Sequence, residues 1–257
     1  MRWWRRHGGA ALIVILLLIG ITATVAAAAP AVPLPDINIG IGQSSNPQDV
    51  ASSLQIIVLL TILTLAPSLL ILMTSFTRIV IVLSFVRNAL ATQQMPPNQV
   101  LIGLALFLTF FVMAPTFAQV NRDALQPYLA GQIAQDEALK RAEAPMRAFM
   151  LKQFTSDKDL ALFVSLAGLP KPNSSDDVPT YALIPAFALS ELKKAFQMGF
   201  MIFIPFIVID MIVASTLMSM GMMMLPPMMI SLPFKIILFV LVDGWYLVAK
   251  SLISSFQ

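Results

Sequence analysis

The chain has 257 residues, of which 58% are hydrophobic and only 11% are charged, whereas soluble domains carry roughly 25% charged residues. A water-soluble core cannot bury so much apolar sequence, so the composition excludes an ordinary soluble domain and indicates a membrane protein whose helices face lipid or partner helices. The net charge of +3 does not indicate nucleic-acid binding, because Arg2, Arg5 and Arg6 supply all of it and the remaining charges balance.

The N-terminus is typical of a secretory signal peptide. The basic start is followed by the apolar run Ala10–Ile21 and then by Ala26–Ala29, small residues of the kind that precede a cleavage site. We therefore expect residues 1–28 to be removed, with the cut at one of the last two alanines, and residues 29–49 to form a polar linker. An uncleaved first membrane helix is the alternative.

Cysteine is absent from the sequence, and the single histidine, His7, lies in the predicted signal peptide. The mature chain would therefore have no thiolate nucleophile, disulfide, imidazole base or soft metal ligand, which excludes most hydrolase chemistry. We expect no enzymatic activity, no cofactor and no metal site.

Residues 50–121 are predicted to form a first hydrophobic helical hairpin. Its first part, Val50–Thr77, carries no charge and is long enough to span a bilayer of about 30 Å. Pro67 should kink or break this helix, and Pro96-Pro97 should end the helix that follows. Residues 88–121 are again uncharged.

Residues 122–184 form a polar segment that we predict to be helical and periplasmic. This segment and the ten residues after it hold 18 of the chain's 29 charged residues. Asp136 with Lys140, and Glu137 with Arg141, are i,i+4 pairs in the favourable acid-first order, which indicates a solvated helix. After signal cleavage the N-terminus would lie outside, so a hairpin returns the chain to the periplasm.

Residues 185–257 are predicted to form a second hydrophobic helical hairpin. Pro185 opens an apolar helix that Pro205 should break, and the last apolar body is Ile230–Leu247. The predicted fold class is therefore all-α: two helical hairpins with kinked or broken helices, flanking a polar helical segment.

Four charged residues lie in apolar stretches: Arg78, Asp210, Lys235 and Asp243. Each costs at least ~2.5 kcal/mol in the middle of a bilayer unless it finds a partner or water. Either a proton relay or substrate path, or structural ion pairing inside an assembly of helices, would explain them. We favour ion pairing, and predict that Lys235 pairs with Glu191 within or between subunits.

Ten of the 16 methionines fall within residues 198–229. They include a triplet held between a glycine and two prolines: Gly221, Met222, Met223, Met224, Pro226 and Pro227. Three consecutive side chains cannot share one face of a helix, and methionine is unbranched and deformable. We predict a loop that projects into a lumen, with the glycine and the two prolines fixing its bend. Ordinary core packing is the alternative.

Several sequence blocks resemble the FliP family of type III export-gate proteins. They lie, in chain order, at Phe76–Ile79, Arg87–Leu90, Pro96–Val100, Pro185–Phe200, Gly221–Pro227, Leu232–Lys235 and Phe239–Trp245. Several long blocks in the same order are far more specific than one short motif, and they cover most of the mature chain. Ala91 is a departure, because the family usually has glycine after Asn-Ala-Leu.

The resemblance implies a function that residue spacing does not show. Members of this family assemble in five copies, with FliQ and FliR subunits, into a helical, ring-like export gate in the inner membrane at the centre of the flagellar basal body. Unfolded proteins pass through its pore, and the methionine loop narrows the closed pore as a gasket. The diproline and the cleavable signal resemble the flagellar branch of the family more than the virulence injectisome.

Two other functions stay open. A proton-coupled secondary transporter would use Asp210 and Asp243 as buried proton carriers. An intramembrane aspartyl protease would use the same two residues, although Asp243 stands in the sequence Val-Asp-Gly-Trp and lacks the usual glycine-rich setting.

Overall fold

A computed structural model of the chain describes residues 47–92, 94–154, 157–170, 172, 174–222 and 224–256. The predicted signal peptide, and all but the last three residues of the predicted linker, lie outside this part of the chain. Residues 56–257 form one compact unit, and residues 47–55, the start of the first helix, belong to a separate N-terminal unit.

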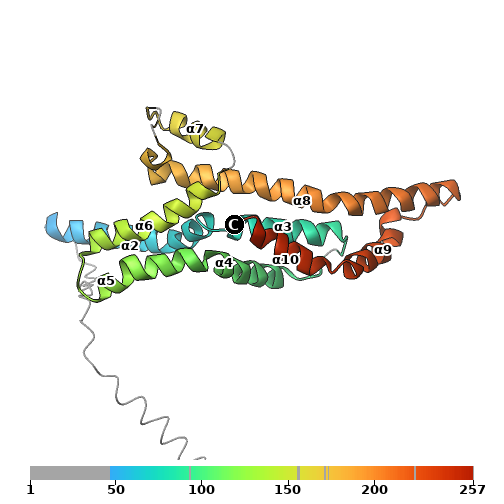
Figure 1. Cartoon of the computed structure of the whole chain (residues 1–257), viewed down its shortest axis with the longest axis horizontal. Helices are drawn as coiled ribbons and strands as arrows, with labels where there is room; N and C mark the ends of the chain where they lie inside the picture. The colour runs from blue at the N-terminus through green and yellow to red at the C-terminus, as the bar shows by residue number, and fades with distance from the viewer. Residues whose placement is uncertain are drawn as a thin grey trace, which may run out of the picture. The chain divides into compact units, whose positions relative to one another are not determined.

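All regular elements in the described part of the chain are helices or helical turns, and this part contains no strand (Figure 1). Its helices are α2 (Pro47–Leu72), α3 (Phe76–Ala89), α4 (Asn98–Val120), the π-helical turn η1 (Asn121–Leu125), α5 (Gln126–Leu129), α6 (Gln135–Lys152), α7 (Asp157–Leu166), the 3-10 turn η2 (Ser175–Asp177), α8 (Thr180–Ser219), α9 (Pro227–Leu241) and α10 (Gly244–Ser254). The all-α prediction is confirmed.

Three stretches are long and apolar enough to cross a membrane: Leu54–Leu72, Asn98–Leu129 and Thr180–Ser219. The helix pair α9 and α10 would make a fourth if its two bent parts are counted as one span. At about 1.5 Å per residue, α8 is about 60 Å long, roughly twice the thickness of the hydrocarbon core of a bilayer. An upright α8 would therefore extend well beyond the membrane.

Prolines interrupt these helices less than the sequence predicts. Pro67 lies inside α2, and both Pro185 and Pro205 lie inside the 40-residue α8. The predicted helix start at Pro185 and break at Pro205 are therefore wrong. A proline removes one backbone hydrogen bond, whereas a full break in apolar surroundings would leave several backbone groups unpaired, so continuing the helix is less costly.

The last apolar body, in contrast, is divided into two helices. α9 ends at Leu241, α10 begins at Gly244, and the two axes are bent by 63°. Asp243, at the break, has a left-handed backbone with φ of 51°, which aspartate tolerates better than most residues. A Cβ on Gly244 would lie 2.3 Å from the ring of Phe239, so glycine is required there.

α3 is the centre of the main core. Its apolar residues Ile79, Val82, Leu83 and Val86 recur at helical spacing and are at most 1% exposed. They pack with side chains from four other helices: Leu101, Ala105, Leu108, Ala195, Phe206, Phe239, Val248 and Leu252. With 14 residues, α3 is too short to span a bilayer, and it forms a buried core helix beside α8 (Figure 1).

A second apolar cluster joins α6 and α7, in the predicted polar segment, to the start of α8. Its buried members are Met150, Leu160, Val164, Val178, Ala182, Leu183, Ala186 and Phe187. Arg147 of α6 donates to the carbonyl of Val178 at 2.7 Å, which fixes the approach to α8. On the solvated side of α6, Arg141 donates to Glu137 at 2.7 Å and holds the pKa of that carboxyl below its usual range.

Much of the apolar surface has no cover within the chain. No described side chain of α2 from Leu54 to Leu72 is buried, and large residues such as Phe107, Met201 and Leu241 are more than two-thirds exposed. Such a surface is stable only against lipid or against other helices.

Candidate functional site

The methionine loop connects α8 to α9. Gly221 has a left-handed φ of 74°, its amide donates to Met218 O at 3.1 Å, and the Met222 amide donates to Leu217 O at 3.0 Å. This pattern is the Schellman arrangement that ends helices at glycine. Pro226 precedes the first turn of α9 and Pro227 begins it, where a proline needs no amide partner.

Of the methionine triplet, Met222 and Met224 are described, and Met223 lies outside the described residues. Met222 is 41% exposed and Met224 is 98% exposed. Neither residue is part of the core of its own chain, so core packing within the chain does not account for them. The loop therefore presents methionine outward, as the projecting-loop prediction requires. A lumen around it stays a prediction.

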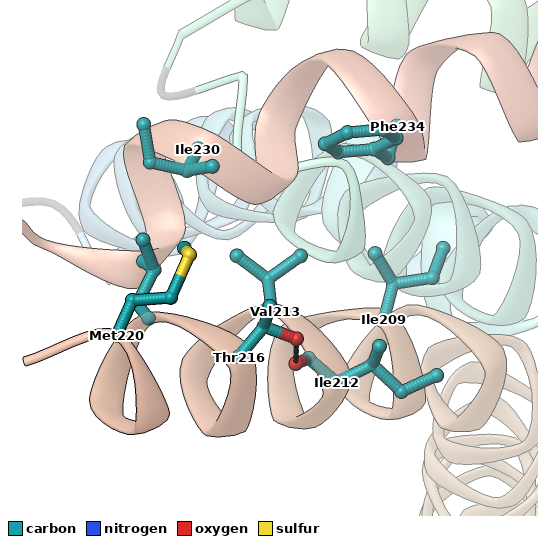
Figure 2. Close-up of a pocket in the computed structure, with 8 residues that line it drawn as sticks. Ile209, Ile212, Val213, Thr216, Met220, Ile230 and Phe234 are labelled. Atoms are coloured by element: carbon teal, nitrogen blue, oxygen red, sulfur yellow. Dashed lines mark hydrogen bonds between the residues drawn. The ribbon is translucent and has the colours of Figure 1, made fainter.

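Beside the loop, α8 and α9 leave an apolar pocket of about 430 Å³ between them (Figure 2). Ile230 and Phe234 of α9 face a row of α8 residues that includes Ile209, Val213 and Met220. The hydroxyl of Thr216 donates to Ile212 O at 2.7 Å within α8, so it is satisfied locally.

Farther from the loop, Lys235 connects α9 to α8. Its Nζ donates to Asp210 Oδ2 at 2.6 Å, and the hydroxyl of Ser231 donates to the other carboxylate oxygen. The Lys235 side chain is only 3% exposed, whereas that of Asp210 is 34% exposed. A buried ammonium group is stable here because its acid partner is fixed by a second hydrogen bond.

Arg78 forms the second buried charged centre. Its Nε donates to Glu191 Oε2 at 2.8 Å, and Nη2 donates to Glu191 Oε1 and to Gln153 Oε1. Nη1 donates to both the carbonyl and the hydroxyl of Ser255, each at 2.9 Å. These five bonds account for all five N–H donors of the guanidinium. The Phe256 ring lies 3.8 Å from Cζ and completes the contact.

The predicted pair of Lys235 with Glu191 does not form within the chain, so that part of the prediction is wrong. Glu191 is bonded to Arg78, and Lys235 is bonded to Asp210. The charges in the sequence do not predict which acid pairs with which base, because the packing of the helices determines which acid lies within reach of each base. A pair between subunits is outside what a single chain tests and stays a prediction.

Asp243 has a different setting from the other three charges. It is exposed at the break between α9 and α10, and it does not cap α10 through its side chain. Its backbone bonds to Val240 and Leu247, but its carboxylate has no hydrogen-bond or ion-pair partner among the described residues. The structure therefore does not bring Asp210 and Asp243 together through any hydrogen bond.

Sequence reasoning missed several polar residues of these centres. Gln153 links Arg78 to Phe256. The Gln153 side-chain oxygen accepts from Arg78, and its side-chain nitrogen donates to Phe256 O at 3.4 Å. Ser231 holds Asp210, and Asp159 of α7 accepts from Lys193 of α8. The only available signal was for Ser231, which stands four residues before Lys235 and so shares its helix face.

The sequence profile of the FliP family matches residues 59–252 of the chain. The chain belongs to the FliP family. The matched region includes the methionine loop and both buried ion pairs, Arg78 with Glu191 and Lys235 with Asp210.

Individual relatives are similar over more than 200 residues of the chain. The chain is 65% identical to the flagellar biosynthetic protein FliP of Bacillus subtilis strain 168 over 218 residues, covering 85% of this chain and 98% of that protein. It is 53% identical over 224 residues to the protein of the same name from Treponema denticola, covering 87% and 83% of the two chains. It is also 53% identical over 235 residues to the flagellar biosynthetic protein FliP of Caulobacter vibrioides, covering 91% of this chain and 86% of that protein.

Ala91, where the family resemblance leads us to expect glycine, has an unusual backbone conformation. Ala91 follows α3 with a left-handed φ of 55°, the conformation that glycine adopts most readily. Its amide donates to Asn88 O at 3.0 Å, which ends the helix.

Proposed function

We propose that the chain is a pore-forming subunit of the flagellar type III protein export gate, which passes unfolded flagellar proteins across the inner membrane. Membership of the FliP family and relatives named flagellar biosynthetic protein support a role in the flagellar export apparatus. The observation that carries the pore itself is the loop after α8, where Met222 and Met224 project outward instead of packing inside the chain.

In the proposed gate, about five copies of the chain surround the passage together with FliQ and FliR subunits, as the family resemblance implies. The uncovered surfaces of α2, α4, α8 and α9 supply apolar area for such contacts and for lipid. The length of α8 supports an assembly that extends beyond the bilayer. The polar segment 122–184 would face the periplasm.

The methionine side chains of the ring would close the idle pore. Unbranched, flexible thioethers fill an irregular gap and yield to a passing chain, and an apolar constriction excludes water and ions. The Schellman cap at Gly221 and the two prolines fix the ends of the loop, so the side chains rather than the helices would move. The proposed role is mechanical and needs no catalytic group.

Replacing Met222, Met223 and Met224 together with alanine tests the gate. The variant should fold, assemble and export, but it should let small ions or solutes leak across the inner membrane. A matched control replaces three exposed methionines distant from the loop in sequence: Met95, Met201 and Met211. A triple-alanine loop that assembles normally and leaves the membrane as tight as the control does would overturn the gasket role.

The secondary-transporter alternative receives no support from the relatives, which are named as flagellar biosynthetic proteins. The protease alternative needs two carboxyls that share a proton. Asp210 is instead bonded to Lys235 and Ser231.

A further inference from the structure

α10 has one buried face and one uncovered face. Val248 and Leu252 point into the main core together with Phe256, whereas Tyr246 and Leu247 are about half exposed. The uncovered face carries an acid at its beginning and a base two turns later, Asp243 and Lys250, both exposed.

Neither charge has an opposite charge as partner among the described residues. The carboxylate of Asp243 has no hydrogen bond or ion pair among the described residues, and the ammonium group of Lys250 lies 5.8 Å from the ring centroid of Tyr246. The other charges in apolar stretches are all paired: Arg78 with Glu191, and Lys235 with Asp210.

The two charges cannot satisfy each other within one helix. They are seven residues apart, which separates them by about 10 Å along the helix axis. Lipid is a poor environment for both of them. The dipole of α10 favours an acid at its N-terminal end, but it does not account for an unpaired base on the same apolar face.

We infer that this face of α10 is a contact between copies of the chain, in which Asp243 of one copy pairs with Lys250 of the next. This face carries both an acid and a base, so copies of the same chain can supply the opposite charge to each without any further protein. The inference rests on the proposed function, because a ring of identical subunits needs a head-to-tail contact that passes from copy to copy.

The offset of about 10 Å between acid and base has a geometric consequence. If α10 stood upright in a flat ring, Asp243 of every copy would lie at one height and Lys250 at another. The pair forms only if α10 is inclined to the ring axis or if successive copies rise in steps. The contact therefore belongs to a staggered arrangement.

Zero-length coupling of the purified full-length complex tests the contact. A water-soluble carbodiimide joins a carboxylate and an amine that touch, forming an amide with loss of water and converting the carbodiimide to its urea. A detection tag inserted after Gly131, in an exposed turn, avoids both the predicted signal peptide and the buried Phe256. Wild-type protein should give a ladder of covalent dimers, trimers and larger species on a denaturing gel.

Two neutral variants identify the pair. Asp243→Asn keeps a residue that tolerates the left-handed backbone, and Lys250→Gln keeps the length of most of the side chain. Each should abolish the ladder, while the control Lys152→Gln, which removes an exposed lysine of α6, should leave it unchanged. A ladder that survives either variant overturns the pair.

The stopping points of the ladder are informative. Coupling that ends at dimers would mean an antiparallel contact of two α10 helices and would overturn the head-to-tail arrangement. A wild-type complex that contains several copies by native mass, but gives no covalent species, overturns the α10 contact and leaves the proposed function standing. A wild-type protein that never associates with itself overturns both.

Charge reversal gives an independent measure. Lys250→Glu places an acid opposite Asp243 of the neighbouring copy and should lower the yield of assembled complex by at least about tenfold, because like charges facing each other repel strongly. Adding Asp243→Asn removes the repulsion and should restore most of the yield. Unchanged assembly of Lys250→Glu would contradict the contact.

Discussion

Arg78 and Glu191 lie 113 residues apart in the sequence and form an ion pair that is about 1% exposed on each side. The pair joins α3 to α8, and through Ser255 the same guanidinium holds the C-terminal end of the chain. A buried pair of this kind is stable only because every donor of the arginine is used.

Removing one partner of this pair should destabilise the chain strongly. Glu191→Gln or Arg78→Met would leave the other charge buried without its counterion, which costs about 3–5 kcal/mol in comparable sites. Thermal unfolding of the detergent-purified protein measures the loss. The double variant Arg78→Met with Glu191→Gln should lose less than the sum of the two single losses. Additive losses would contradict a direct pair.

Lys235 should couple to Asp210 and not to Glu191 within one chain. A double-mutant cycle between Lys235→Met and Asp210→Asn should give a coupling of about 1.5–3 kcal/mol, typical of a hydrogen bond to a charged group. The same cycle with Glu191→Gln should give almost none for the isolated chain. Coupling to Glu191 that appears only in the assembled complex would establish the pair between subunits.

Gly199 should be sensitive to the addition of a single methyl group. A Cβ there would lie 2.4 Å from a ring carbon of Phe85, close to the base of that side chain, which cannot easily move away. Gly199→Ala should therefore cost about 1–3 kcal/mol through forced separation of α3 and α8. Gly103→Ala is the matched control, because nothing lies within 4 Å of its Cβ. It should be neutral or stabilising, since alanine favours helix.

Ala91→Gly should stabilise the chain. The left-handed conformation at Ala91 costs an alanine about 1–2 kcal/mol, and glycine removes this strain. Part of the gain is offset by the greater backbone freedom of glycine in the unfolded chain, about 0.4–1 kcal/mol. A rise in the midpoint of thermal unfolding checks the prediction. A drop would mean that the alanine side chain makes a stabilising contact.

The mature N-terminus should be Ala29 or Pro30. The predicted signal peptide lies outside the described residues, so mass is the direct test. Intact-mass measurement of the purified protein should show loss of the segment that includes Arg2, Arg5 and Arg6. A mass that still contains it would support an uncleaved first membrane helix.

The sequence determined the fold class and the family because both depend on residue patterns that can be recognised without knowing the tertiary structure. Long, continuous apolar stretches of this kind are stable in a membrane as helices, because a helix bonds every backbone group within the segment. The FliP-like blocks and their order can also be read directly from the sequence, and they indicate the family. The sequence also predicted the methionine loop, because a glycine and two prolines around three methionines leave no room for a continuous helix.

Only the tertiary structure decided where helices continue through proline and which charges meet. Pro205 ends a helix by local rules, but the cost of unpaired backbone in apolar surroundings favours continuation. Glu191 had several bases available, and the packing of α3 against α8 placed Arg78 beside it while α9 placed Lys235 beside Asp210. Local propensity acts between neighbours in sequence, whereas ion pairing depends on distances that only the packed helices set.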